Sequence, residues 1–136
     1  RALRDRRAAR RRLSNAELRA RLQPVLGLLA RDPASLSSVR DPEEAWRVHV
    51  IDSLSGLDLV GAPDRLADVG AGAGFPGLVL AAALPATRVD LIESVARKCA
   101  FIEKAIEAAG LDNARAVCDR AETWAAAAEP AGPARI

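Results

Sequence analysis

The chain has no methionine and no tyrosine, and aromatic residues make up only 3% of its 136 positions. Its two cysteines, Cys99 and Cys118, are too few for a disulfide scaffold or a four-cysteine zinc site, and His49 is the single histidine. Apolar runs are too short for a transmembrane helix, and no apolar segment follows the basic N-terminus as it would in a secretory signal. We therefore expect a cytoplasmic protein without a metal centre and without membrane contact.

Arginine is abundant and unevenly distributed. Residues 1–21 contain nine arginines against Asp5 and Glu17, a net charge of +7, whereas the whole chain carries +2, so the remainder carries −5. One interpretation of residues 1–12 is a solvated arm. The other is an arm that contacts phosphates, because arginine pairs bidentately with phosphate and such contacts produce salt-sensitive binding to nucleic acid.

Two helices are predicted in the N-terminal region, which we take to span residues 1–60. Ser14 and Glu17 have the spacing of a capping box, and Pro24 inside the following helix should kink or split it. The apolar face of this helix comprises Leu18, Leu22, Val25, Leu26 and Leu29. Asp41 has the position of an N-cap for the second helix. The apolar face of the second helix comprises Ala45, Val48 and Ile51.

The C-terminal region, residues 61–136, alternates between short apolar runs and helical patterns. Strands are predicted at 65–69, 87–92 and 114–118, and helices at 75–84 and 94–109. This alternation is typical of an α/β protein whose parallel sheet is built from βαβ units with right-handed crossovers. The second of these helices is expected to turn toward the core Ala96, Ala100, Ile102 and Ile106.

The first predicted strand ends in a glycine-rich segment, DVGAGAGFPG, at residues 68–77. A loop that leaves a parallel strand and enters a helix must turn tightly and admit a ligand close to its backbone, and glycine permits both. Doubly wound sheets bind their ligands at the carboxyl ends of the strands. The segment therefore predicts a ligand-binding loop; the alternative is a turn that only packs a helix on a strand.

Two classes of nucleotide ligand fit this loop. Gly72, Gly74 and Gly77 satisfy the G-x-G-x-x-G spacing of dinucleotide sites, which would make the chain an NAD-dependent oxidoreductase. Asp68 and Pro76 favour S-adenosylmethionine (SAM) instead. A carboxylate suits the sulfonium and ammonium groups of SAM but repels a diphosphate, and proline removes a backbone donor from the start of the helix.

Two further segments would complete a nucleoside site. Glu93 ends the second strand, where a carboxylate can accept hydrogen bonds from both ribose hydroxyls; its alternative role is to cap the following helix. Residues 118–122, CDRAE, follow the third strand and either flank an adenine ring or form an ordinary surface turn. His49 and Asp52 are the remaining candidates near the site, with simple packing as the alternative for His49.

Several separated segments resemble one family, the bacterial 16S ribosomal RNA methyltransferases called RsmG or glucose-inhibited division protein B (GidB). The matching segments are VRDPEE (39–44), HVIDSL (49–54), DVGAGAGFPG (68–77), LIES (91–94) with Arg97 and Lys98, and RAE (120–122). The resemblance covers roughly residues 36–125. The chain departs from the family at 34–38, where the family usually has a stretch that ends in Asn-Leu-Thr.

This resemblance implies a class I SAM-dependent methyltransferase fold, a Rossmann-like parallel sheet with N-terminal helices. The implied contacts to SAM are lining residues (Gly70, Phe75), ribose-holding residues (Glu93, Ser94, Val95) and residues that border the adenine (Ala121, Glu122). The implied reaction transfers the methyl group of SAM to N7 of a guanine in 16S ribosomal RNA of the small ribosomal subunit. Because N7 has an available lone pair, no general base and no catalytic side chain are expected, and the rate depends on positioning.

The family continues beyond the third loop with further strands, whereas three strands are readable here. We therefore expect a sheet that is incomplete at its C-terminal side, in a portion of a longer protein that is inactive alone. Besides the oxidoreductase, a non-catalytic RNA-binding fragment is an alternative function.

Overall fold

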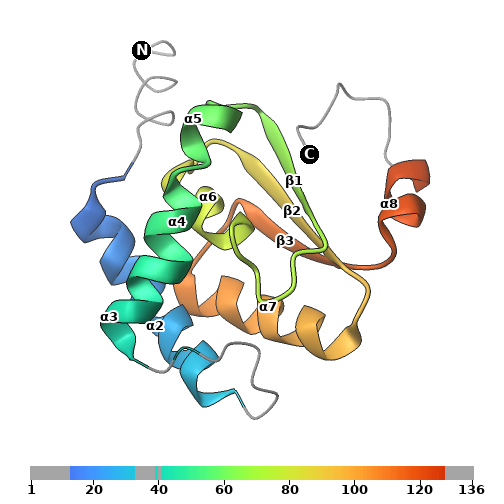
Figure 1. Ribbon diagram of the computed structural model, residues 1–136. Coiled ribbons are helices and arrows are strands. Elements are labelled where there is room, and N and C mark those ends of the chain that lie inside the picture. Colours follow the sequence, from blue (N-terminus) through green and yellow to red (C-terminus); the bar gives the residue numbers. More distant parts are fainter. Residues whose placement is uncertain (1–12, 33–38, 40, 128–136) are drawn as a thin grey trace.

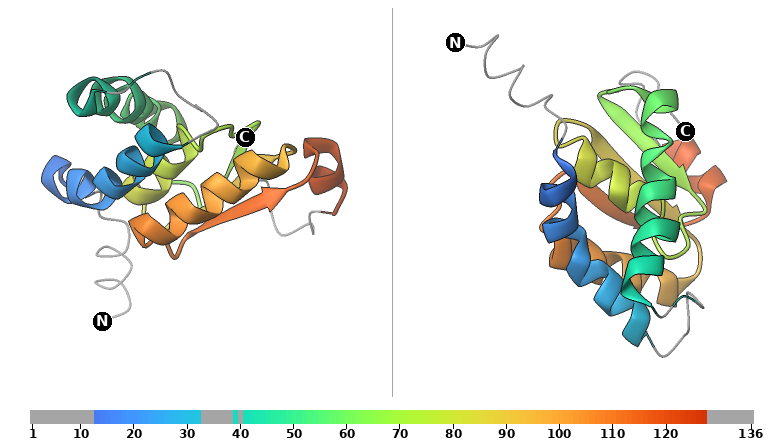
Figure 2. Two further views of the ribbon diagram at one scale, coloured as in Figure 1. Left: turned by 90° about the horizontal axis from the view of Figure 1, so that it is seen from below. Right: turned by 60° about the vertical axis from the view of Figure 1, so that its left-hand side comes forward.

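A computed structural model describes residues 13–32, 39 and 41–127 of the chain (Figure 1). Its parallel sheet contains β1 (Arg65–Val69), β2 (Arg88–Glu93) and β3 (Ala114–Cys118), in that spatial order. The crossovers contain α6 (Gly77–Ala83) and α7 (Ala96–Ala109). Because parallel crossovers are right-handed and the strands follow one another across the sheet, both helices cover the same face (Figures 1 and 2). The predicted βαβ units are confirmed.

The first crossover helix is shorter than predicted, although the strands begin and end within one residue of their predicted positions. It starts at Gly77 instead of residue 75, with Pro76 as its N-cap, and ends before Leu84. Phe75 and Pro76 therefore belong to the glycine-rich turn. Every residue of α6 is buried, because its small alanine side chains let the helix lie close to its neighbours.

The N-terminal helix α2 (Asn15–Arg31) packs on α6 and α7. Its start confirms the capping box, since Ser14 Oγ accepts from the Glu17 N–H and the Glu17 carboxylate accepts from the Ser14 N–H. The predicted leucine- and valine-rich face is buried. The helix is continuous through Pro24, so the expected split is wrong. Burial of the flanking apolar side chains outweighs the single backbone hydrogen bond that proline removes.

The second helical region is divided into α3 (Pro42–Ala45), η1 (Trp46–Ile51), α4 (Asp52–Leu54) and α5 (Leu57–Val60). As predicted, Asp41 caps it by accepting from the Glu44 N–H. The predicted apolar face is partly wrong, because Val48 and Ile51 are 37% and 44% exposed and Val50 is fully buried. η1 is a π-helix, whose i to i+5 hydrogen bonds place more residues in each turn than an α-helix. The wider turn brings position 50 to the core.

The core-facing side of α7 also differs from the prediction. Ala96 and Ala100 are exposed, Ile102 is fully buried and Ile106 is half-buried. Successive helical residues are about 100° apart, which places Ala96 and Ala100 across the helix from Ile102. The buried side of α7 comprises Cys99, Phe101, Ile102, Ala105 and Ala109.

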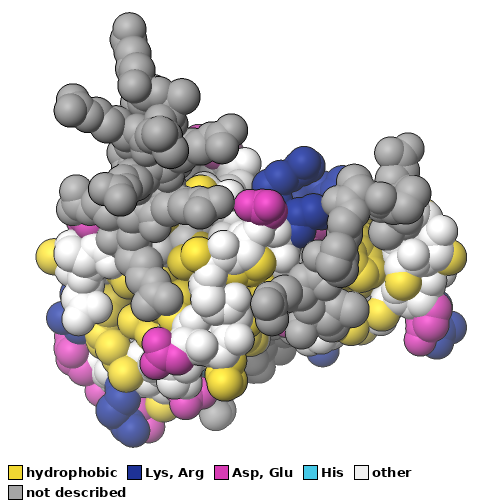
Figure 3. Space-filling model, turned by 90° about the horizontal axis from the view of Figure 1, so that it is seen from above, with side chains coloured by type: hydrophobic (Ala, Val, Ile, Leu, Met, Phe, Trp, Pro, Cys, Tyr) yellow, Lys and Arg dark blue, Asp and Glu magenta, His cyan; other side chains and the backbone are white. Residues whose placement is uncertain are grey.

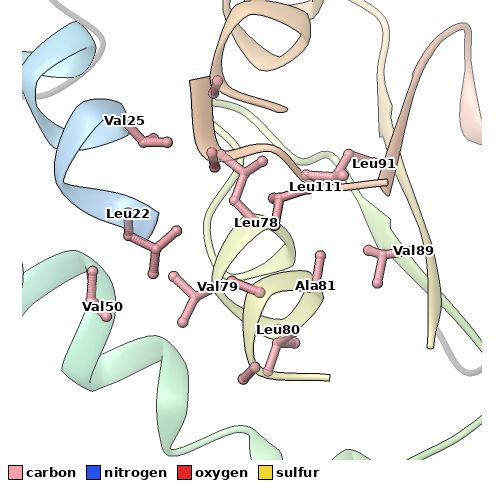
Figure 4. Packing of buried hydrophobic residues seen from close by; sticks show 14 of the residues in the cluster. Leu22, Val25, Val50, Leu78, Val79, Leu80, Ala81, Val89, Leu91 and Leu111 are labelled. Carbon is pink, nitrogen blue, oxygen red and sulfur yellow. The ribbon is translucent and has the colours of Figure 1, made fainter. Parts of the chain in front are cut away.

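A single hydrophobic core joins the N-terminal helices to the sheet (Figure 4). Leu22 of α2 and Val50 of η1 approach α6 from one side, and Val89 and Leu91 of β2 approach it from the other. This core includes residues from both sides of the expected boundary at residues 60 and 61, and the division into two regions stays a prediction. Within the described ranges, no helix combines the length and the apolar character required to cross a bilayer.

Candidate functional site

A small cavity lies at the carboxyl ends of the three strands, where the loops that follow β1, β2 and β3 meet. Its volume is about 220 Å³. It is lined by Val69, Gly70, Ile92, Glu93, Ser94, Asp119, Arg120, Ala121 and Glu122. Five of the seven predicted cofactor-binding residues are therefore brought together, although they come from three separate loops. The other two, Phe75 and Val95, do not line this cavity.

The glycine-rich loop is attached to β2 through its backbone. The N–H groups of Gly70 and Ala71 both donate to the carbonyl oxygen of Ile92, at 2.9 and 3.0 Å. Gly70 has a φ of 71°, in the left-handed region, and no atom lies within 4 Å of the Cβ that another residue would place there. The loop therefore exposes its backbone to open space beside the cavity, as a ligand-binding turn requires.

Asp68 and Gly77 hold the other end of this loop. The Gly77 N–H donates to Asp68 Oδ2 at 2.9 Å, and a Cβ on Gly77 would lie 2.7 Å from that oxygen and 2.8 Å from Leu91 Cδ2. Burial raises the pKa of Asp68 above its ordinary 3.8, and the hydrogen bond from Gly77 opposes this shift. The structure thus uses Asp68 to fix the start of α6, while its expected contact with the SAM cation stays a prediction.

Glu93 is a buried carboxylate in the cavity wall. The residue is only 7% exposed. Its two carboxylate oxygens accept hydrogen bonds from the N–H groups of Gly72 (3.0 Å) and Val95 (2.9 Å). The Val95 N–H lowers the pKa of Glu93 below its ordinary 4.5, burial opposes that shift, and Gly72 adds to it. Glu93 therefore links the glycine-rich loop to the turn before α7, but Val95 is the N-cap of that helix and no side-chain hydrogen bond caps it. An ionised carboxylate has about four acceptor positions, and the N–H groups of Gly72, Val95 and Ser94 do not fill all of them.

The third loop leads into α8 (Ala121–Ala127), which forms the opposite wall of the cavity. No residue of α8 is buried. Trp124 Nε1 donates to Asp90 Oδ2 at 3.1 Å, and the Arg115 guanidinium donates to both oxygens of the same carboxylate. Asp90 therefore connects α8 to the outer face of the sheet. The sequence analysis missed this contact. Two signals were available: Trp124 is one of only two tryptophans, and Asp90 is an acidic residue inside an apolar strand.

Phe75 lines a second cavity, of about 380 Å³, at the other end of the glycine-rich loop. The His49 ring stacks on the Phe75 ring, with centroids 4.9 Å apart and planes inclined by 26°. Asp52 lines the same cavity. Burial lowers the pKa of His49 below its ordinary 6.5. The structure thus places His49 and Asp52 beside the glycine-rich loop, as the sequence suggested, but they line the second cavity and not the first.

Basic side chains gather on the face seen from above in Figure 3. Arg65 and Arg88 are register partners at the starts of β1 and β2, so two cations lie side by side at the end of the sheet opposite the first cavity. The arginine-rich segment 1–12 lies outside the described residues. Among the residues that are described, no three histidine, cysteine or carboxylate side chains are grouped as metal ligands.

Comparison with known proteins identifies the family. The model of GidB, described as rRNA small subunit methyltransferase G, matches residues 28–131. The chain belongs to the GidB family. The resemblance inferred from the separated segments is thereby confirmed.

Three relatives of this chain carry the name "Ribosomal RNA small subunit methyltransferase G". One from Synechococcus sp. (strain JA-2-3B'a(2-13)) is 43% identical over 97 residues, which are 66% of this chain and 37% of that protein. One from Myxococcus xanthus is 43% identical over 109 residues, 79% of this chain and 50% of that protein. One from Methylobacillus flagellatus is 39% identical over 120 residues, which are 87% of this chain and 56% of that protein. The chain thus spans about half the length of these relatives, or less.

A solved structure supports the fold of this GidB chain. A mutant of MtNAS in complex with S-adenosylmethionine superimposes with a TM-score of 0.55 at 17% sequence identity, over 81% of this chain and 43% of that one. With its parallel sheet and crossover helices, the chain has the class I, Rossmann-like methyltransferase fold that the sequence predicted.

Proposed function

We propose that this chain carries the SAM-binding part of a methyltransferase that acts on N7 of a guanine in 16S ribosomal RNA. The observation that supports this most is the first cavity: in a chain of the rRNA small subunit methyltransferase G family, loops after three parallel strands bring together Gly70, Glu93, Ser94, Ala121 and Glu122. Ligands of open α/β sheets bind at this position. The small ribosomal subunit is the proposed partner.

The cavity suits the nucleoside half of SAM. Its volume of about 220 Å³ is smaller than the roughly 300–1,000 Å³ of sites that enclose a whole drug-sized ligand. The lowered pKa of Glu93 keeps its carboxylate ionised at neutral pH, so its unused lone pairs can accept from the two ribose hydroxyls. Ser94 follows at the ribose, Ala121 and Glu122 border the adenine, and the backbone at Gly70 lies under the ligand. Val95 lies outside the cavity and contributes through the hydrogen bond from its N–H to Glu93.

The same geometry disfavours a dinucleotide. A diphosphate bound at the start of α6 would need free backbone donors there, but Pro76 has none and the Gly77 N–H already donates to Asp68. The diphosphate would also face the carboxylates of Asp68 and Glu93. SAM, which carries a sulfonium and an ammonium group, meets no such repulsion.

Bound SAM would supply an electrophilic methyl group for an in-line displacement by guanine N7. The acceptor nitrogen has no proton to lose, so the side chains of this chain need to bind and orient, and no general base is required. The ionised Glu93 fixes the glycine-rich loop and the start of α7 to one another, which holds the ribose end in one place. Such positioning is the main source of rate enhancement in this proposal.

Titration calorimetry of the chain with SAM, S-adenosylhomocysteine and NADH tests this proposal. We expect binding of the first two ligands and none of NADH. Gly70→Asp should reduce SAM affinity at least tenfold, because it adds a side chain and a negative charge beside the cavity. Gly61→Asp is the matched control, since Gly61 also has a left-handed φ (65°) and open space at its Cβ position but lies outside the cavity. NADH binding, or equal losses for both variants, would contradict the proposal.

A further inference from the structure

The second cavity combines an aromatic wall with a carboxylate side chain. It lies between the η1–α4 helix and the end of the glycine-rich loop. Its lining residues are Val48, His49, Asp52, Ser53, Ser55, Gly56, Phe75 and Pro76. Its volume of about 380 Å³ lies within the range of pockets that enclose small organic ligands.

The stacked pair formed by His49 and Phe75 gives this cavity an aromatic wall. Gly70, near the start of the glycine-rich loop, lines the first cavity, and Phe75, near its end, lines the second. The two cavities therefore lie at opposite ends of one loop. Unpaired RNA bases are typically bound by stacking on aromatic side chains. The aromatic wall therefore indicates a base, and the glycine-rich loop connects this cavity to the first one.

Asp52 provides the polar recognition in this cavity. Its carboxylate is exposed and makes no hydrogen bond or ion pair to other residues in the described part of the chain. The two serine hydroxyls are already engaged, because Ser53 Oγ donates to the His49 carbonyl oxygen and Ser55 Oγ donates to the Asp52 carbonyl oxygen. The free acceptor of the cavity is thus a carboxylate, which matches a ligand edge with two adjacent N–H donors.

We propose that this cavity receives the target guanine, stacked against the His49–Phe75 pair with its N1–H and N2–H groups donating to the Asp52 carboxylate. Enzymes that modify bases commonly extrude the target nucleotide into such a pocket. The inference rests on the proposed function, and it adds the residues that select the substrate base. Adenine has no pair of donors on this edge and is discriminated against.

This orientation leaves the reacting atom available. N7 lies on the side of the purine opposite N1 and the exocyclic N2, so contacts to Asp52 do not block it. Because burial lowers the pKa of His49, its ring is uncharged at neutral pH. An uncharged ring does not repel the positive charge that the purine gains when N7 is methylated.

Nuclear magnetic resonance with the ¹⁵N-labelled chain tests the inference, with guanosine 5′-monophosphate and adenosine 5′-monophosphate as probes. We expect the guanosine nucleotide to shift the His49 ring and Phe75 amide signals, and the adenosine nucleotide to bind there at least about tenfold more weakly. Asp52→Asn should abolish this preference. Asp58→Asn, at an exposed carboxylate on the neighbouring α5 outside the cavity, should preserve it.

Two substitutions at His49 separate stacking from a merely structural role. His49→Ala should weaken guanosine binding by about tenfold, in line with the contribution of base–aromatic stacking, and His49→Phe should restore it. Failure of His49→Phe to rescue, with both variants folded by their spectra, would contradict the stacking role.

The outcomes also distinguish this inference from the proposed function. Guanosine-induced shifts confined to Gly70, Glu93 and Ser94, or an unchanged preference in Asp52→Asn, would overturn the guanine site. Absence of S-adenosylhomocysteine binding to the unmodified chain would instead overturn the methyltransferase proposal, while guanosine-selective shifts at His49 and Phe75 would still support a guanine site.

Discussion

The two walls of the first cavity are held in different ways. On the glycine-rich side, four backbone N–H groups of the loop are bonded to β1 or β2, at Asp68, Ile92 and Glu93. On the α8 side, no helical residue is buried, and a side-chain hydrogen bond from Trp124 to Asp90 links the helix to the sheet. One wall is part of the core, and the other is attached to its surface.

This difference bears on how a ligand would be bound. Regions with few buried contacts open at a lower free energy than the core, so α8 should open more often than the glycine-rich loop. In the proposed function, the Glu93 side, which would hold the ribose, is then fixed before the ligand arrives, and the α8 side, which would hold the adenine, adapts to it. Four substitutions test this contrast, from the largest expected effect to the smallest.

Gly77→Ala should break the fixed wall. The new Cβ would overlap Asp68 Oδ2 and Leu91 Cδ2, and neither the buried strand nor α6 has room to move. We expect the free energy of unfolding, measured with urea, to fall by about 2–3 kcal/mol. Gly27→Ala in α2 is the control, because its Cβ would meet only the mobile end of Arg31, at 3.1 Å. That variant should be unchanged or more stable by about 0.5–1 kcal/mol, since alanine favours a helix. Similar losses in both would contradict the tight packing of α6.

Glu93→Gln should weaken the same wall through its charge. At pH 7 we expect a loss of about 2 kcal/mol, because two part-buried N–H groups lose an ionised acceptor. The folded-state pKa of Glu93 is below 4.5, so its contribution is present above pH 4.5 and is lost as the pH falls through the folded-state value. Urea unfolding at several pH values should therefore show a weaker acid destabilisation in Glu93→Gln than in the unmodified chain.

Asp68→Asn is the matched contrast for Glu93→Gln, because its pKa shift has the opposite sign. The folded-state pKa of Asp68 lies above 3.8, so this group contributes most stability below pH 3.8 and loses it as the pH rises through the folded-state value. Asn can still accept from the Gly77 N–H. We expect this variant to be destabilised more steeply by acid than the unmodified chain. The same pH dependence in both variants would refute these opposite roles.

Trp124→Phe should remove the hydrogen bond that links α8 to Asp90. We expect the smallest loss in the free energy of unfolding, about 1 kcal/mol for one hydrogen bond. Hydrogen exchange should lose protection at residues 121–127 and stay unchanged in α6. Binding of S-adenosylhomocysteine should weaken severalfold, because α8, where we propose that the adenine binds, is no longer held against the sheet. Trp46→Phe is the control, since Trp46 lies in η1 against Arg19. Unchanged exchange at α8 in Trp124→Phe would show that another contact holds this helix.

Local chemistry made much of the fold predictable. Ser14 and Asp41 are recognisable caps because their side chains bond to a backbone N–H three residues later, a relation contained in four consecutive residues. The strands are readable because each is a short apolar run between turn residues. The glycine-rich loop and the position of Glu93 in the cavity wall follow from their places at strand ends, so the candidate cavity could be predicted as well.

Other features depended on contacts that are distant in the sequence. The inward position of Val50 depends on the π-helical turn of η1, and the exposure of Ala96 and Ala100 depends on which side of α7 meets its neighbours. Phe75 belongs to a predicted loop, yet its ring stacks on His49, 26 residues earlier, in a second cavity. The bond between Asp90 and Trp124 joins residues 34 positions apart.

The order of the strands and helices, their caps and the turn that a ligand can approach were thus determined by the sequence alone, because each depends on interactions among near neighbours. The tertiary structure decided which side of each helix is buried, which of the seven candidate residues line the first cavity, and how firmly each wall is held. Those outcomes depend on packing between segments far apart in the chain, where a small rotation of one helix exchanges its buried and exposed residues.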